Sequence, residues 1–322
     1  MKAIICRDVL IGEENTEKLS SSQMKKWKER RFQKLENLID GATGSGISFL
    51  CLLGKTFSNG SLEERNVDRL FEVVKSEASL QVFTVLEYSD FKRLNYRDDF
   101  PENFHILCLG ASNDAHESKG FRVEVSRSAV ELSFNDKNLI NIEIDEDDIE
   151  CLINKKKVDI PFFEPLGFED NRNGQFGHTL IEFDEHDLKW RNVNSAVYTY
   201  QEAELPIAPT DSFKDVSERI SRIIPKLEND TFFRFTLKGI SRFGMTFNVS
   251  ALKDMLQKKV FYAEVFDNTV MEVDAADFEH DISLKSEFVR LALQDETLSE
   301  TERNRLISCG WNALNGKEVD AE

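Results

Sequence analysis

The chain has 322 residues, 40% of them hydrophobic and 25 of them Phe, which is enough for two domains or for one large domain with an appendage. A formal net charge of −18 argues against a chain that binds nucleic acid by itself, because such binding neutralises phosphates with Lys and Arg, but it leaves DNA contact through a partner open. No apolar run approaches the roughly 20 residues of a membrane helix, the first residues are charged too early for a signal peptide, and the five Cys are scattered without a C-x-x-C pair, so we expect a cytoplasmic protein with no membrane association.

Two buried strands, each followed by a polar loop, organise the start of the chain. An apolar strand over residues 3–6 runs into the loop 8–12, and a second strand over residues 47–53 runs into the loop 54–59. Between them, an amphipathic helix is predicted over residues 20–40, with Ser at its start and Gly at its end. Ligand and metal sites form where neighbouring strands of an α/β sheet end, so we expect the two loops to lie side by side at such a site.

The predicted helix carries basic residues opposite its apolar stripe. Its apolar residues recur at helical spacing and are Met24, Trp27, Phe32, Leu35, Leu38 and Ile39. Its basic residues are Lys25, Lys26, Lys28, Arg30 and Arg31. This basic face could contact nucleic acid, but the acidic balance of the rest of the chain favours a solvated surface.

Further strands and one more helix are predicted up to about residue 205. The helix covers residues 62–77, and the strand that follows it leads into Tyr88, Ser89 and Asp90. Alternation of apolar and polar residues from 121 to 144 indicates half-exposed antiparallel strands. The predicted strands are 81–86, 105–109, 121–125, 130–134, 138–144, 177–184, 188–192 and 197–203.

A linker and a smaller unit follow. Two Pro within residues 205–210 predict the linker. Beyond it, two helices alternate with short strands in a pattern that predicts a small α+β unit; the helices are 212–226 and 249–257, and the strands are 232–239, 260–265 and 270–273. The last forty residues predict a pair of helices, the second of which begins with a capping box formed by Ser299 and Glu302.

The order of these loops resembles the SbcD/YhaO family of DNA-repair nucleases, which are calcineurin-like metallophosphoesterases. The resemblance covers most of residues 1–205. The first loop of that family reads roughly S-D-x-H-L-G and the second G-D-x-F-D. Here Asp8 remains, but Leu10 stands where the His belongs, and Lys55 stands where the metal-bridging Asp belongs.

Two later motifs of the family are altered as well. Its third loop reads Gly-Asn-His-Asp, and this chain has Tyr88 and Ser89 at the Asn and the His. A later segment of the family supplies two metal-binding His, and this chain has Asn154 and Lys156 in their places. The resemblance therefore implies a metallophosphoesterase scaffold with degenerate ligand positions.

The chemistry of the family makes these replacements severe. Two-metal hydrolysis of a phosphoester needs two cations about 3.5–4 Å apart, and hard cations of this kind need Asp, His and Asn ligands. An ammonium at Lys55 would repel such a cation at about 4 Å by several kcal/mol at an effective dielectric constant near 20. We therefore expect no catalytic residue, no bound metal and no other cofactor, and we expect Asp8 to pair with Lys55.

The resemblance also implies a domain plan and a partner. It implies an α/β fold with a layered metallophosphoesterase-like sandwich (residues 1–205), a small α+β capping domain (206–280) and a C-terminal helical pair (281–322). In the family, such a pair binds the coiled-coil base of an SMC-like ATPase of the SbcC or YhaN type. We expect Phe288 and Trp311 to be its main exposed anchors. The full set of expected partner-binding residues is Leu284, Phe288, Leu291, Leu306, Ile307, Trp311 and Leu314.

The leading hypothesis is a pseudo-nuclease subunit that docks on such an ATPase in DNA repair or in defence against phage and other foreign DNA. It would reach DNA only through the complex, and a homodimer is left open. One alternative is an active phosphoesterase or nuclease with unconventional ligands, although none of the five His falls in the motif loops. The other alternative is an unrelated α/β interaction module.

Overall fold

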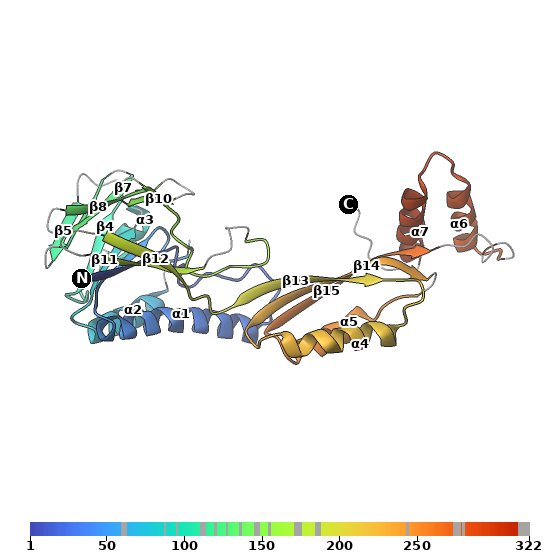
Figure 1. Ribbon diagram of the computed structural model, residues 1–322, viewed down its shortest axis with the longest axis horizontal. Helices are drawn as coiled ribbons and strands as arrows, with labels where there is room; N and C mark the ends of the chain where they lie inside the picture. The colour runs from blue at the N-terminus through green and yellow to red at the C-terminus, as the bar shows by residue number, and fades with distance from the viewer. Residues whose placement is uncertain are drawn as a thin grey trace. The chain divides into compact units, whose positions relative to one another are not determined.

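The computed structural model describes residues 1–58, 63–86, 88–94, 96–109, 114–118, 121–126, 128–134, 137–144, 149–153, 156–170, 176–183, 188–242, 245–272, 278 and 281–314. In this part of the chain, α-helices alternate with strands of three sheets, so the protein is of the α/β class, as predicted (Figure 1). The chain divides into two compact units, Met1–Tyr198 and Thr199–Glu322.

The first unit is built around a six-stranded sheet in the order β12-β11-β1-β2-β3-β4. Strands β1 to β4 are parallel, β11 is antiparallel to β1, and β12 is antiparallel to β11. The strands are β1 (Lys2–Arg7), β2 (Ile47–Leu53), β3 (Gln81–Leu86), β4 (Phe104–Cys108), β11 (Gly177–Phe183) and β12 (Leu188–Asn194). The prediction that the first three strands lie side by side is confirmed. Their continuous apolar sequences are explained by burial on both faces of the sheet.

Helices cover one face of this sheet (Figure 1). Leu35 and Ile39 of α1 and Leu70 of α2 form one core with the residues of β1 and β2 that point to this side, such as Ile4 and Leu50. The helices of the unit are α1 (Ser21–Gly44), α2 (Glu64–Ser76) and α3 (Tyr88–Leu94). A capping box at Ser20 begins α1, in which its side chain accepts from the Gln23 N–H.

A second, antiparallel sheet packs on the other face. Its strands follow one another in the order β10-β9-β8-β7-β6-β5. They are β5 (Asp114–Ser118), β6 (Phe121–Val125), β7 (Ala129–Phe134), β8 (Lys137–Ile144), β9 (Ile149–Ile153) and β10 (Lys156–Val158). The core between the sheets includes Phe121, whose ring stacks on that of Phe49 at a centroid distance of 4.2 Å. The first unit therefore has three layers, one of helices and two of sheet.

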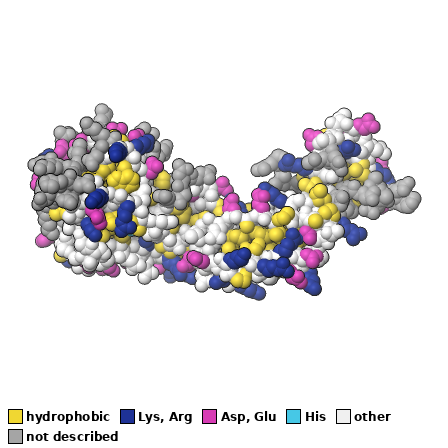
Figure 2. All heavy atoms as spheres, viewed as in Figure 1, with side chains coloured by type: hydrophobic (Ala, Val, Ile, Leu, Met, Phe, Trp, Pro, Cys, Tyr) yellow, Lys and Arg dark blue, Asp and Glu magenta, His cyan; other side chains and the backbone are white. Residues whose placement is uncertain are grey.

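The second unit has the order βαβαβ, and its three strands are parallel. Its elements are β13 (Thr199–Ile207), α4 (Phe213–Ile223), a 3-10 turn (Ile224–Lys226), β14 (Thr231–Arg242), α5 (Val249–Gln257) and β15 (Tyr262–Glu272). Helices α4 and α5 share one core with the sheet through Val216, Leu252 and Phe235. On the surface of this unit, apolar side chains gather over the strands (Figure 2), and Ile240 and Phe266 are 45% and 43% exposed.

The structure corrects the predicted boundary between the units. The predicted linker over residues 205–210 begins inside a strand: residues 199–207 form β13, and Leu205–Ile207 pair with Leu237–Gly239. The boundary lies after Tyr198 instead of after residue 205. Pro206 is tolerated because β13 is an edge strand in the sheet as described, next to β14. The parallel strands also make this unit α/β instead of α+β, and β15 is one continuous strand.

The chain ends in the expected pair of helices, α6 (Leu284–Gln294) and α7 (Glu300–Leu314). Val289 and Ala292 of α6 meet Ile307 of α7 in a small core. The backbone N–H of Met271 donates to the Ser308 hydroxyl at 3.0 Å, which ties α7 to the end of β15. The pair is therefore part of the second unit and is not a detached tail.

Candidate functional site

The loops that follow β1 and β2 lie side by side, as the sequence predicts. Hydrogen bonds continue the parallel pairing beyond the strands: the Leu10 N–H donates to the Lys55 carbonyl at 3.0 Å, and the Ile11 N–H donates to the Thr56 carbonyl at 2.9 Å. The Ser58 N–H then donates to the Ile11 carbonyl at 3.0 Å. Leu10 and Lys55, two of the positions that the resemblance aligns with metal ligands, are therefore adjacent in space.

The Asp8 carboxylate is part of this loop structure. Its Oδ1 accepts from the Lys55 N–H at 2.8 Å, and its Oδ2 lies 3.4 Å from Nε of Arg7. The Arg7 guanidinium in turn lies 4.0 Å from the centroid of the Phe162 ring. Asp8 thus contacts Lys55 through the Lys55 backbone N–H, and its ion-pair partner among the described residues is Arg7. Both carboxylate oxygens have structural partners.

The backbone around Asp8 adopts unusual dihedral angles and approaches the Asp8 carboxylate closely. Asp8 and Leu10 have φ values of 50° and 53°, a left-handed conformation that costs an L-residue about 1–2 kcal/mol. Gly54 has φ 71°, and a Cβ atom there would lie 2.3 Å from Asp8 Oδ1 and 3.0 Å from Cδ1 of Ile149. The close approach of the carboxylate therefore requires Gly at position 54.

The remaining degenerate positions are less closely gathered. Tyr88 begins α3 directly after β3 and is 66% exposed. Lys156 is exposed at the start of β10 in the second sheet. Asn154 and the side chain of Ser89 lie outside the described part of the chain. Leu10 is 8% exposed, so an apolar side chain is buried where the resembled family places a metal-binding imidazole.

The described His residues lie away from these loops. His105 and His116 stack with ring centroids 3.7 Å apart, and burial, with a further electrostatic contribution from the neighbouring His116, lowers the pKa of His105 to about 4. His178 on β11 lies 3.3 Å from the Ser195 hydroxyl, and burial lowers its pKa to about 4. His186 and His280 lie outside the described residues. Across the described ranges, no three His, Cys, Asp or Glu side chains form a group suited to a metal ion.

A buried ion pair was not predicted from the sequence. Nζ of Lys34 in α1 lies 2.6 Å from Oε1 of Glu164, and the two side chains are only 9% and 1% exposed. Lys34 also donates to the Phe163 carbonyl at 2.5 Å, and Glu164 accepts from the Val197 N–H at 2.9 Å. Burial lowers the pKa of Lys34, although Glu164 opposes this shift. The only signal in the sequence was the place of Lys34 next to Leu35 on the apolar side of the helix.

The helical pair exposes four of the seven expected partner-binding residues, all of them leucines, but Ile307 is buried and the two expected main anchors are packed. Phe288 and Trp311 are not exposed anchors; both pack on the small core of Phe278, Val289 and Ile307. Position 310 explains the arrangement of Phe288, because a Cβ atom at Gly310 would lie 2.2 Å from the Phe288 ring. The exposed apolar side chains are aliphatic: Leu284 at 75%, Leu291 at 60%, Leu306 at 42% and Leu314 at 39%.

Comparison with the known protein families finds none that matches this chain, and no curated protein is similar to it. Among the described helices, none is long and apolar enough to span a membrane.

Proposed function

We propose that this protein is a catalytically inactive, SbcD-like subunit that docks on an SMC-like ATPase of the SbcC or YhaN type and acts in DNA repair or in defence against foreign DNA. The observation that carries the proposal is that the Asp8 carboxylate is already occupied by partners within the protein. It stands where a metal ligand belongs in the resembled family, yet it accepts from the Lys55 N–H at 2.8 Å and pairs with Arg7. The parallel order of β1, β2 and β3, with loops meeting at one edge, supports the same scaffold.

The surroundings of Asp8 favour a structural role. Hard divalent cations need several oxygen or imidazole ligands. Near Asp8, the loops place the buried aliphatic side chain of Leu10, which cannot bind a metal, and the backbone of Lys55. A cation bound here would have to break the bond between Asp8 and the Lys55 N–H, and this cost opposes binding.

Metal titration tests the inactive state. We expect that calorimetric titration of the full chain with Mn²⁺ gives no saturable two-site isotherm and that the chain cleaves no DNA. Asp8→Asn keeps an oxygen acceptor for the Lys55 N–H and should be nearly silent for function. A two-site isotherm at micromolar affinity, together with nuclease activity that Asp8→Ala abolishes, would instead establish the active phosphoesterase.

The exposed leucines of the helical pair support the docking role. Leu284 and Leu291 are one heptad apart on α6 and are 75% and 60% exposed. Apolar anchors at such spacing are typical of a helix that lies in a groove of its partner. The net charge of −18 favours a partner with a basic surface. In this proposal the anchors are the exposed leucines, and Phe288 and Trp311 hold the pair together.

Capture of the partner from the native cell tests docking. The full chain should retain an SMC-like ATPase, identified by mass spectrometry, and Leu284→Ser with Leu291→Ser should abolish retention without changing the melting temperature. Glu296→Ser, on the exposed turn between the helices, is the control and should leave the complex intact. Retention of no ATPase by the folded full chain would favour the unrelated interaction module.

A further inference from the structure

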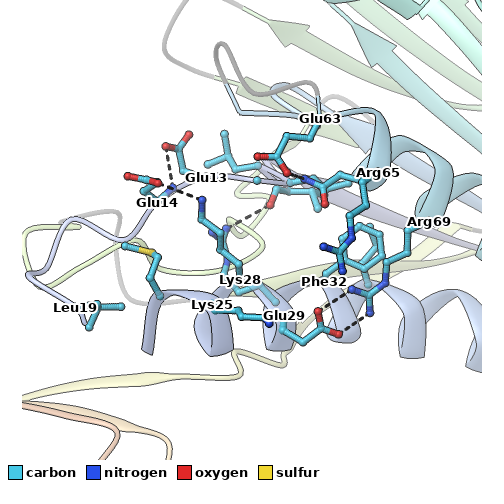
Figure 3. A pocket seen from close by; sticks show the side chains of 18 of the residues that line it. Glu13, Glu14, Leu19, Lys25, Lys28, Glu29, Phe32, Glu63, Arg65 and Arg69 are labelled. Carbon is cyan, nitrogen blue, oxygen red and sulfur yellow. Dashed lines mark hydrogen bonds and ion pairs between the residues drawn. The ribbon is translucent and has the colours of Figure 1, made fainter. Parts of the chain in front are cut away.

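A cavity of about 570 Å³ lies in the first unit between the loop after β1 and the helices α1 and α2 (Figure 3). Its volume falls within the roughly 300–1,000 Å³ of small-molecule sites. Its apolar lining comes from Val9, Ile11, Met24, Phe32 and Leu35. Leu10 also lines it but Asp8 does not, so the cavity is distinct from the Asp8 carboxylate.

Charged side chains of both signs surround this apolar lining, and several of them are already paired. The Lys28 ammonium lies 3.2 Å from the Glu14 carboxylate. Arg69 donates both terminal nitrogens to Glu29 at 2.8 Å and also pairs with Glu36 at 2.7 Å. Glu14 thus has the Lys28 ammonium as its partner, and Glu29 shares the Arg69 guanidinium with Glu36.

Two cations at the cavity have no such partner. Lys25 in α1 and Arg65 in α2 are exposed, line the cavity and make no hydrogen bond or ion pair with any described residue. Figure 3 shows Arg65 next to Phe32, and Lys25 beside Glu29. Hydrogen bonds from Arg69 lower the pKa of Glu29, and the charges of Arg65 and Lys25 add to this effect. Both cations are therefore close enough to the Glu29 carboxylate to interact with it.

The lining also offers hydrogen-bond acceptors. The carboxylates of Glu13 and Glu63 line the cavity and are labelled near its upper edge in Figure 3. A ligand that uses the whole cavity would therefore combine an anionic group, an apolar or planar body and N–H donors. A bare phosphate would occupy little of the 570 Å³.

We propose that this cavity binds a nucleoside phosphate. Lys25 and Arg65 hold the phosphate groups, since a guanidinium offers paired donors that match phosphate oxygens. The base lies against the apolar lining, and its N–H groups donate to Glu13 or Glu63. The proposal does not depend on the pseudo-nuclease function, because the site shares no metal-ligand position other than the buried Leu10.

The test is calorimetric titration of the full chain with ATP in the presence of EDTA, so that no divalent cation contributes. We expect saturable one-site binding. Lys25→Ala and Arg65→Ala should each weaken it about tenfold or more, as the loss of a hydrogen bond to a charged group implies. Lys75→Ala removes an exposed cation from the same helix as Arg65, away from the cavity, and should leave the affinity unchanged.

Two further titrations separate the parts of the ligand. Adenosine should bind at least about tenfold more weakly than ATP, because it lacks the group that Lys25 and Arg65 hold. Inorganic phosphate should also bind more weakly, because it leaves the apolar lining in contact with water. Unchanged melting temperatures would show that the variants are folded. Absence of ATP binding, equal affinity for ATP and phosphate, or ATP affinity unchanged in both pocket variants would overturn the proposal.

Discussion

Replacing Glu164 with Gln should strongly destabilise the first unit. The substitution keeps the size of the side chain and an acceptor for the Val197 N–H, but it removes the negative charge 2.6 Å from the Lys34 ammonium. Lys34 is only 9% exposed, so water cannot replace the carboxylate. Removal of one partner from a buried ion pair typically costs about 3–5 kcal/mol, and we expect a loss in that range near neutral pH.

The pH dependence of this loss tests its cause. Burial already lowers the pKa of Lys34, and loss of Glu164, which raises it, would lower it further. In the unfolded chain Lys34 titrates near its ordinary value of about 10.4. Between the two pKa values the unfolded state binds more protons than the folded state, so the stability of Glu164→Gln relative to the wild type rises with pH. The loss should be smaller at about pH 9.5 than at about pH 7.

Urea denaturation followed by circular dichroism measures these changes. In a double-mutant cycle, Lys34→Met with Glu164→Gln should lose less than the sum of the single variants, with a coupling energy of about 1–3 kcal/mol. Glu150→Gln is the control, because Glu150 and Lys157 form a pair whose side chains are 43% and 62% exposed and which contributes at most about 1 kcal/mol. A loss below about 1 kcal/mol in Glu164→Gln, or strict additivity in the cycle, would refute the reasoning.

Three further predictions concern single positions. Gly54→Ala should lower the melting temperature, with a cost of at least about 1 kcal/mol, because φ is 71° and the new Cβ would lie 2.3 Å from Asp8 Oδ1; an unchanged melting temperature would contradict this. Gly310→Ala should displace the Phe288 ring and speed amide hydrogen exchange in α6 and α7 more than elsewhere, and uniform exchange would argue against this contact. Cys309 should react first with a thiol reagent at mildly alkaline pH, because the other four Cys are buried; burial raises the pKa of Cys6, for example, to about 12.

The sequence by itself determined the elements that depend on local periodicity. Continuous apolar runs identified β1, β2 and β3, and the order of strands and helices led to a sheet in which they are neighbours. Alternation identified the antiparallel strands β6, β7 and β8. These predictions succeed because consecutive residues reveal how a strand is buried: a continuous apolar run indicates burial on both faces, and alternation indicates burial on one face.

Predictions from local sequence were wrong where strand pairing or helix packing decided the structure. Pro206 suggested a linker, but an edge strand needs no N–H donor on its open side, and Leu205 and Ile207 pair with β14. Phe288 and Trp311 looked like exposed anchors because their spacing alone does not reveal which side of the helix meets α7. The absence of a side chain at Gly310 makes room for the Phe288 ring, which packs between the helices, whereas the leucines are exposed.

The candidate sites required contacts between residues far apart in the chain. The motif loops could be placed together from their strands, but the bond between Asp8 and the Lys55 N–H depends on left-handed turns that no periodicity encodes. Lys34 and Glu164 are 130 positions apart, and the cavity brings Lys25 and Arg65 together from two helices. These distances decide which charges are neutralised within the protein and which remain available to a ligand. The reason is that electrostatic interactions depend on separation in space and on burial.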